Sequence, residues 1–220
     1  MIPPEQDGEF VASMERVLDV YKRPYDENVP LICMDESPKQ LIESVQEEIM
    51  EPGKEKRVDY EYIRHGVVNI FMANAPLEGK RLVEVTGFKK KRDWALFMKR
   101  ISDGMYPEAK KITPVMDNYK THSIGAFYET FEPVEAKRLM DKFEFVFTPK
   151  HGSWLNMAEI ELHTLNTQCI NGHIPTMEKI KSEVEAWQKH RNNKYSKINW
   201  QFTTQDARIK LRRLYPSIDG

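Results

Sequence analysis

The sequence predicts an α/β domain in which a mixed β-sheet is flanked by helices. Its 220 residues, 40% hydrophobic and 30% charged, are enough to build one globular domain with a sizeable core. Strand-like and helix-like segments alternate along most of the chain, which is typical of α/β layers. One pair of strands is joined by a short turn and therefore runs antiparallel, so the sheet is mixed rather than fully parallel.

The chain is expected to begin with a helix and a buried strand. The segment "GEFVASMERVLDVYKRPY" repeats apolar side chains at helical spacing and ends at Pro24. Residues 31–34 form a short apolar run, which predicts a buried strand that stops at Asp35. The charged stretch "IESVQEEIMEPGKEKRVDYEY" predicts a helical piece followed by an exposed excursion.

A hairpin and an amphipathic helix come next. Residues 67–73 and 81–86 read as two strands joined by a turn at 76–79, which contains Pro and Gly. In "KKKRDWALFMKRISDGMY" the large apolar side chains recur at helical spacing, so this segment predicts a helix with one buried face.

The second half of the chain alternates between the two kinds of element. "ITPVMD" predicts a strand that stops at Asp117, and "IGAFYETFEPVEAKRLMDK" a helix with a break at Pro133. From Phe143 to Thr148, phenylalanines alternate with other residues as on a strand. The loop "PKHGSWL" then leads into a helix, and "TMEKIKSEVEAWQKHRNN" predicts a last long helix.

Composition excludes several classes of protein. No apolar run approaches the roughly 20 residues that span a bilayer, and the acidic N-terminus lacks the apolar core of a secretory signal. The two cysteines form no CxxC pattern, so a disulfide framework or zinc site is not expected and a reducing cytoplasm is the simplest location. The net charge of −1 excludes a uniformly basic nucleic-acid binder.

The charge is nevertheless segregated along the chain. Residues 1–60 carry 15 acidic and 7 basic side chains, whereas residues 179–213 carry 10 basic and 3 acidic ones. This asymmetry is compatible with a C-terminal surface that faces a polyanion, and equally with two solvated faces.

Three carboxylates are candidates for a metal site. Asp35 and Asp117 each end a buried strand, and functional sites of α/β sheets form where strand ends meet. A single Asp at such a position is usually a turn residue, but two of them with a carboxylate from a helix form the oxygen-rich set that Mg²⁺ prefers. Two such ions about 4 Å apart can stabilise both the attacking and the leaving oxygen in phosphoryl transfer.

The third carboxylate is either Glu159 or Glu161. Two residues turn a helix by about 200°, so only one of them can face the aspartates. The spacing of Asn156 and Glu159 alone favours a capping box, which would assign Glu159 to the helix start. His122 and His163 lie near these acids in the sequence, but a lone histidine is more often a packed or surface residue than a metal ligand.

The motifs "CMDES", "VMDNYKTH" and "FTPKHGSWLNMAEIEL", in this order, resemble the catalytic domain of DDE transposases. The match is to the bacterial "IS six-thirty" branch of the mariner superfamily, and it extends over most of the chain through "YEYIRHGVVNIFMANAPLEGKR" and "WQFTTQDARIKLRRLYP". The resemblance implies an RNase H-like fold and Mg²⁺-dependent cleavage and strand transfer of insertion-sequence DNA, with Mn²⁺ as a possible substitute.

The resemblance also assigns residues. Asp35, Asp117 and Glu159 fall on the catalytic, metal-binding positions, which reverses the preference for a cap, and Glu161 becomes the outward partner. Lys150 and His151 would lie close to DNA phosphate. The C-terminal basic residues are the main candidate for DNA contact, with residues 89–92 second; the four named for this role are Arg208, Lys210, Arg212 and Arg213.

The expected partners are transposon ends and target DNA at the bacterial nucleoid, and further copies of the chain on that DNA. The whole chain, residues 1–220, is expected to be one catalytic domain without the helix-turn-helix region that begins such transposases. Three explanations stay open: the downstream half of a split reading frame with a separately encoded N-terminal half, a truncated remnant, or a separately made catalytic domain. Two alternatives remain: an RNase H-like nuclease that does not join strands, and an inactive remnant that binds DNA or inhibits a full-length transposase.

Overall fold

The computed structural model describes residues 6–45 and 61–217 and contains one five-stranded mixed sheet in the order β3-β2-β1-β4-β5. The strands are β1 (Leu31–Ser44), β2 (Tyr62–Ala75), β3 (Lys80–Thr86), β4 (Thr113–Met116) and β5 (Val146–Phe147). Strand β2 runs antiparallel to both of its neighbours, β1 and β3, whereas β4 runs parallel to β1 and β5 parallel to β4. The predicted mixed sheet is therefore confirmed.

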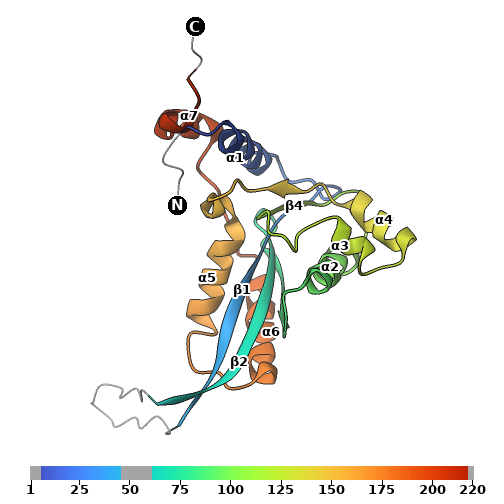
Figure 1. Cartoon of the computed structure of the whole chain (residues 1–220), viewed down its shortest axis with the longest axis vertical. Coiled ribbons are helices and arrows are strands. Elements are labelled where there is room, and N and C mark those ends of the chain that lie inside the picture. Colours follow the sequence, from blue (N-terminus) through green and yellow to red (C-terminus); the bar gives the residue numbers. More distant parts are fainter. Residues whose placement is uncertain (1–5, 46–60, 218–220) are drawn as a thin grey trace.

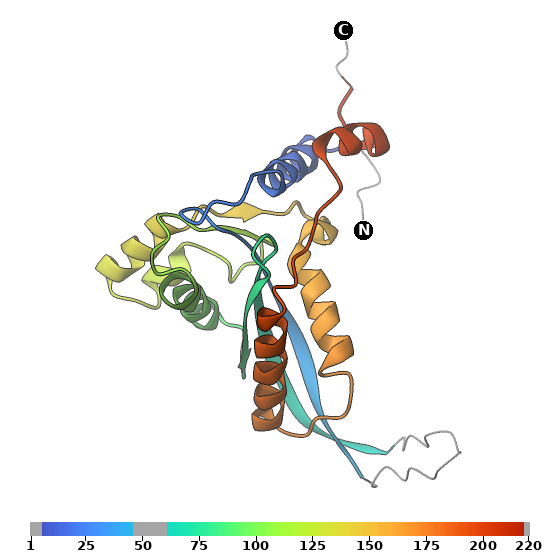
Figure 2. The same ribbon diagram turned by 180° about the vertical axis from the view of Figure 1, so that it is seen from behind.

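Helices cover both faces of this sheet (Figures 1 and 2). The principal helices are α1 (Gly8–Tyr21), α2 (Lys91–Arg100), α3 (Gly125–Tyr128), α4 (Pro133–Lys142), α5 (Met157–Gln168), α6 (Met177–Asn193) and α7 (Thr204–Lys210). Short turns of other helix types lie at Ile101–Met105, Ser153–Leu155 and Arg212–Leu214. None of the helices in the described ranges is both long and apolar enough to cross a membrane.

Strand alternation divides the core between the two faces. Ile32 and Met34 of β1 pack with the residues of α2, α3 and α4, and the three phenylalanines that follow α4 lie against this same cluster. Cys33, between them, points to the opposite face, where it packs with α1 and the start of α5. Farther along the hairpin, side chains of β2 and β3 pack against α5 and α6. Asp35, two residues after Cys33 on β1, shares the face of Cys33.

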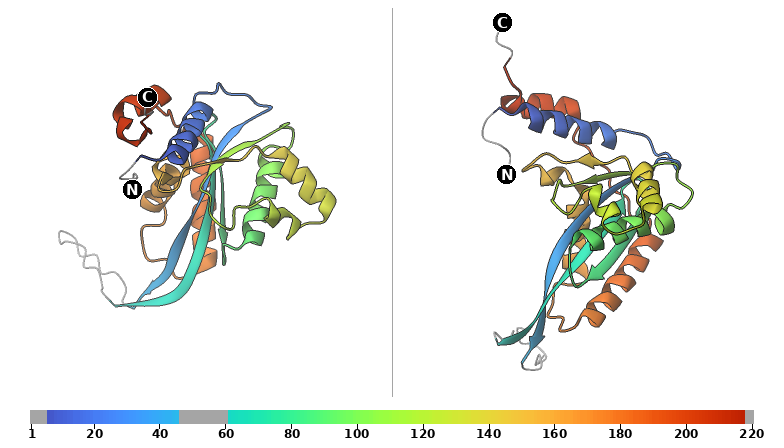
Figure 3. Two further views of the ribbon diagram at one scale, coloured as in Figure 1. Left: turned by 45° about the horizontal axis from the view of Figure 1, so that its top comes forward. Right: turned by 45° about the vertical axis from the view of Figure 1, so that its right-hand side comes forward.

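Strand β1 is longer than predicted, because it continues through Asp35 to Ser44 instead of stopping. The charged residues beyond Asp35 pair along β2, whose backbone supplies their hydrogen bonds, and a bulge lies between Gln40 and Ile42. The predicted helical piece is therefore wrong for Ile42–Ser44, and its remainder at residues 46–60 lies outside the described residues. The two strands extend together beyond the rest of the fold (Figure 3).

The predicted phenylalanine strand is shorter than expected. Only Val146 and Phe147 form a ladder with β4, and Phe143 adds a single bridge to Ile112. The period of two is still confirmed, because Phe143, Phe145 and Phe147 all pack on one side against the α2–α4 cluster.

Side chains of α6 bind the outer backbone of β3, the edge strand. The Asn192 side chain accepts a hydrogen bond from the Arg81 N–H (2.8 Å) and donates one to the Arg81 carbonyl (2.9 Å). One turn earlier, the Gln188 Oε1 accepts from the Val83 N–H. Two helical residues therefore satisfy backbone groups that an edge strand otherwise presents to solvent.

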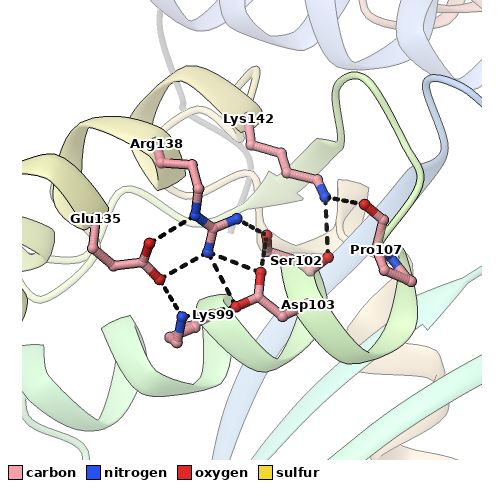
Figure 4. A network of polar contacts seen from close by, with 7 residues as sticks. All are labelled: Lys99, Ser102, Asp103, Pro107, Glu135, Arg138 and Lys142. Carbon is pink, nitrogen blue, oxygen red and sulfur yellow. Dashed lines mark hydrogen bonds and ion pairs between the residues drawn. The ribbon is translucent and has the colours of Figure 1, made fainter.

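A network of ion pairs joins α2 and the turn after it to α4 on the other face of the sheet (Figure 4). Arg138 contacts Glu135 through its Nε at 2.7 Å and Asp103 through its Nη2 at 2.9 Å, and Lys99 contacts both acids. Hydrogen bonds from Arg138 and Lys99 hold the pKa of Glu135 at about 2. Because these side chains are partly solvated, the network contributes little to stability.

Candidate active site

Asp35 lies on β1, and Asp117 directly follows the last residue of β4, the parallel strand beside it. The ladder between β1 and β4 pairs Cys33 with Val115, two residues before each aspartate, and Asp117 is near enough for its charge to raise the pKa of Asp35. Asp35 shares the face of Cys33, which α1 and α5 cover, whereas the Asp117 Oδ1 lies 2.7 Å from the Nδ1 of His122. The parallel pairing thus brings together two acids that are far apart in the sequence.

Glu159 approaches this pair from the first turn of α5, which packs on β1 and β2. The Asn156 side chain caps the helix by accepting a hydrogen bond from the Ala158 N–H at 3.1 Å. The Asn156 N–H donates to the Ser153 carbonyl at 2.7 Å, so the reciprocal half of the predicted capping box is not formed. Within the described part of the chain, the exposed Glu159 carboxylate has no hydrogen bond or ion pair.

Asn156 also joins the start of α5 to β1. Its Nδ2 donates to the Met34 carbonyl at 2.9 Å and lies 3.3 Å from the Asp35 Oδ2. The residue is buried, with 2% of its surface exposed, so these bonds have no competing water. One side chain therefore fixes the helix that carries Glu159 relative to the strand that carries Asp35.

Replacing Asn156 with Ala is expected to lower the free energy of unfolding by about 2 kcal/mol, because both a helix cap and a buried hydrogen bond to Met34 are lost. Urea denaturation at pH 7 measures this change. Thr176 caps α6 at an exposed position through the Lys179 N–H. Its replacement by Ala serves as the matched control, with an expected loss of about 1 kcal/mol. Equal losses would show that the bonds to β1 contribute nothing.

The carboxylates act on one another electrostatically. Burial is the largest cause that raises the pKa of Asp35 to about 7, and the negative charges of Asp117, Glu36 and Glu159 raise it further. The hydrogen bond from the Glu36 N–H at 2.8 Å opposes this rise. A cluster of this kind favours either a bound proton or a bound cation.

The Asp35 pKa predicts a pH-dependent stability in the absence of metal. The folded chain holds a proton on Asp35 up to about pH 7, whereas the unfolded chain releases it near pH 4. Stability from this group is therefore present below pH 4 and lost as the pH rises through 7. We expect the free energy of unfolding of Asp35→Asn to exceed that of wild type by about 2 kcal/mol at pH 8 in EDTA, and to equal it at pH 3.5. Denaturation curves at both pH values test this, and a gain that is equal at both would contradict it.

His122 bridges Asp117 to Glu36, a residue that sequence reasoning missed. His122 Nε2 lies 2.7 Å from the Glu36 Oε1, and its Nδ1 lies 2.7 Å from the Asp117 Oδ1. The Nδ1 has hydrogen-bond geometry only toward the Asp117 backbone carbonyl, at 3.1 Å, so the shielded Oδ1 is left without a hydrogen bond. Burial lowers the pKa of His122, but the two carboxylates outweigh it and raise the pKa to about 10.

The same three side chains form a set of potential metal-binding atoms, which lie within 4.8 Å of one another. His122 is buried and stacks on Trp94, with ring centroids 5.7 Å apart. Asp117 and Glu36 favour the charged form of the His122 ring, and Trp94 holds the ring in place. His122 therefore orients Asp117 as a cationic partner and is not a free metal ligand. Alternation along β1 could have indicated Glu36, because it points to the face opposite Asp35, where His122 packs.

Glu161 differs from its prediction, since it is buried instead of outward-facing. Only 1% of it is exposed, and it forms ion pairs with Arg81 and Arg191. The sequence does not indicate these partners, because they lie on β3 and α6. His163, one turn after Glu159, is exposed.

The loop between β5 and α5 presents Lys150 and His151 to solvent. His151 has a φ of 64°, in the left-handed region. A Cβ on Gly152 would lie 2.5 Å from the ring of Pro149, so a glycine is needed where the loop folds back. The "PKHG" stretch is thus a tight turn that follows β5, the strand paired with β4.

The predicted DNA-contacting residues of the C-terminal segment differ in their availability. Arg208 forms a bidentate pair with Glu15 of α1, with both N–O distances at 2.8 Å. Lys210 lies 3.8 Å from Asp206, whereas Arg212 and Arg213 are exposed. Near the site itself, the Lys89 ammonium lies 5.2 Å from the ring centre of Tyr119, two residues beyond Asp117.

Comparison with known proteins gives one family and one set of structures. A family model described as DDE superfamily endonuclease matches residues 30–181. The structure resembles the Mos1 mariner paired end complex with Mn at a TM-score of 0.60 and 14% identity, covering 89% of this chain and 60% of the Mos1 chain. The Mos1 strand transfer complex has a TM-score of 0.59 and 10% identity, covering 86% of this chain and 55% of the Mos1 chain. The paired end complex with Mg has a TM-score of 0.57 and 10% identity, covering 99% of this chain and 66% of the Mos1 chain.

These likenesses show that the fold is RNase H-like, as in the Mos1 transposase. The chain spans less than two thirds of the length of the first Mos1 chains that it matches. No curated protein sequence is significantly similar to it.

Proposed function

The chain belongs to the DDE superfamily of endonucleases, and from this membership we propose that it is the catalytic domain of a transposase. Within the family we place it in the bacterial "IS six-thirty" branch, on the motifs "VMDNYKTH" and "FTPKHGSWLNMAEIEL". The proposed reaction is metal-dependent cleavage of DNA at the ends of an insertion sequence, followed by strand transfer into a target. All 220 residues would form this one domain and work at the bacterial nucleoid.

The observation that carries the proposal is the arrangement of Asp35, Asp117 and Glu159. The proposal is supported by the charges of Asp117 and Glu159, both near enough to raise the pKa of Asp35, and by the β1–β4 ladder that ends two residues before the two aspartates. Within the described residues, no lysine or arginine neutralises any of the three. Asp117 has the His122 ring beside it, but three carboxylates with no other cationic partner still repel one another, and they provide the oxygen ligands that Mg²⁺ and Mn²⁺ prefer.

The protein's own residues hold these ligands in place. When bound, the metal would polarise phosphate oxygens and activate the attacking hydroxyl. Asn156 orients Asp35 through its Nδ2, while the cationic His122 restrains Asp117 and is itself held by Glu36. Neighbours of this kind keep ligands in a fixed geometry, which raises their affinity for a metal.

DNA must be held outside the acidic pocket, by basic side chains. We propose that Lys150, His151 and Lys89 contact phosphate near the site, since they are exposed beside the loops that carry Glu159 and Asp117. Arg212, Arg213 and Lys210 would extend this contact along the C-terminal segment, and Arg208 would join it only by leaving Glu15. Several copies of the chain would act together on DNA.

The test is an assay of cleavage and joining on labelled duplexes that carry the element ends, with EDTA, Mg²⁺ or Mn²⁺. Metal-dependent nicking and joined products are expected. Nicking without joining would identify a nuclease, and metal-independent DNA binding without nicking would identify an inactive remnant. Failure to cleave and to bind Mn²⁺ would reject the proposal.

A further inference from the structure

We propose that Glu161, held by Arg81 and Arg191, is the positioning residue that sets the direction of Glu159. The inference rests on the proposed function, because it concerns the same metal site. The cluster joins three elements through charged side chains: Arg81 of β3, Glu161 of α5 and Arg191 of α6.

The contacts are directional. The guanidinium of Arg81 approaches the Glu161 carboxylate with two nitrogens, at 2.6 Å from Nε to Oε2 and at 2.9 Å from Nη2 to Oε1. Arg191 adds a third bond at 2.8 Å from its Nη2 to Oε1. The Arg81 Nη1 also donates to the Gly79 carbonyl at 2.7 Å. A bidentate pair of this kind restricts rotation as well as distance.

The position of this charge in the helix is unusual. The buried residues of α5 include Ala158, Glu161 and Leu165, which form one stripe at helical spacing. A leucine at position 161 would complete an apolar stripe, and well-packed apolar residues often replace buried ion pairs without loss of stability. Stability alone therefore does not explain the cluster, and Arg191 even leaves its buried Nε without a partner.

What the cluster adds is a fixed rotation of α5. An apolar stripe can slide or turn slightly against a sheet. The two hydrogen bonds from the Arg81 guanidinium to the Glu161 carboxylate, in contrast, form only when the carboxylate lies in one orientation. Glu159 and Glu161 differ by about 200° around the helix axis. Anchoring Glu161 toward β3 and α6 therefore fixes the direction in which Glu159, whose charge acts on Asp35, leaves the helix, while Asn156 fixes the start of the helix.

The frame that receives Glu161 is itself rigid. Asn192, next to Arg191 on α6, binds the backbone N–H and carbonyl of Arg81. The Asn192 side chain therefore holds the backbone of Arg81 beside α6, independently of the carboxylate of Glu161. The two arginines keep their relative position through bonds that do not involve Glu161.

The experiment measures Mn²⁺ affinity by water-proton relaxation, and kcat and KM for cleavage of an element-end duplex. Glu161→Gln is expected to weaken Mn²⁺ binding and lower kcat by about tenfold to a hundredfold, with KM for DNA within twofold of wild type. Glu135→Gln is the matched control, because Glu135 also binds two cations but on the opposite face (Figure 4). Its Mn²⁺ affinity and kcat should equal those of wild type.

A folded Glu161→Gln protein with wild-type Mn²⁺ affinity and kcat would overturn the inference and leave the proposed function intact. If Glu161→Gln does not fold, the triple variant Arg81→Met, Glu161→Leu, Arg191→Met replaces it, since it leaves no unpaired buried charge. This variant should fold and show the same weakened Mn²⁺ binding, and wild-type affinity would again overturn the inference. A wild-type chain that binds no Mn²⁺ would instead reject the proposed function, and this inference with it.

Discussion

Replacing Glu159 with Gln is expected to lower the rate of metal-dependent DNA cleavage by roughly a thousandfold, with no loss of stability. Outer residues that only orient metal ligands contribute about tenfold to a hundredfold, so a direct ligand should contribute more. The carboxylate has no hydrogen bond or ion pair in the described part of the chain, and its removal relieves repulsion at Asp35. Single-turnover cleavage in Mg²⁺ and thermal denaturation in EDTA measure the two effects.

Glu178→Gln is the matched control for this change. Glu178 lies in the first turn of α6 and is exposed, as Glu159 is in the first turn of α5. Both substitutions remove a negative charge that stabilises a helix start by about 0.5 kcal/mol. At Glu159 the relief of repulsion at Asp35 offsets this loss. Only Glu159→Gln should affect cleavage. A Glu159→Gln protein that cleaves within tenfold of wild type would remove Glu159 from the metal site.

Truncating Glu161 to Ala should give the largest loss of stability, about 3–5 kcal/mol. The substitution leaves the guanidinium groups of Arg81 and Arg191 facing each other, with Arg81 only 1% exposed and without its carboxylate. Urea denaturation at pH 7 measures the loss, which would be a large fraction of the total stability of a domain of this size.

Two comparisons make this result interpretable. Glu135→Ala removes an acid with two cationic partners at a partly solvated site, so we expect a loss of about 1 kcal/mol or less. The apolar triple variant at positions 81, 161 and 191 should recover most of the stability that Glu161→Ala loses. A loss below 1 kcal/mol for Glu161→Ala would show that water enters the cluster and hydrates the arginines.

Much of the fold follows from local sequence patterns. The hairpin, α1, α6 and β4 agree with their predicted segments, because each has a clear period and a Pro, Gly or Asp near its end. The prediction failed where pairing outweighs composition. Residues 36–44 are charged and carry no strand signal of their own, yet they extend β1 because β2 lies beside them along their whole length.

The site was predictable to a similar extent. The apolar runs that end at Asp35 and Asp117 indicate these two residues, and the resemblance to transposase motifs indicates Glu159. That the three residues bind metal stays a prediction. The roles of Glu36 and Glu161 could not be predicted, because their partners His122 and Arg81 are distant in the sequence. Asn156 was predicted correctly as a cap, but its bond to the Met34 carbonyl depends on how α5 lies on the sheet.

The hydrogen bonds from Asn192 and Gln188 to β3 also restrict how copies of this protein can associate. A second chain cannot add a strand beside Arg81 and Val83, because their outward N–H groups are already taken by side chains of the same molecule. At the opposite edge, β5 offers a ladder of only two residues. Extending the sheet from one molecule to the next is thus disfavoured at both ends, which protects the chain against β-type aggregation and leaves any association of copies to side-chain surfaces.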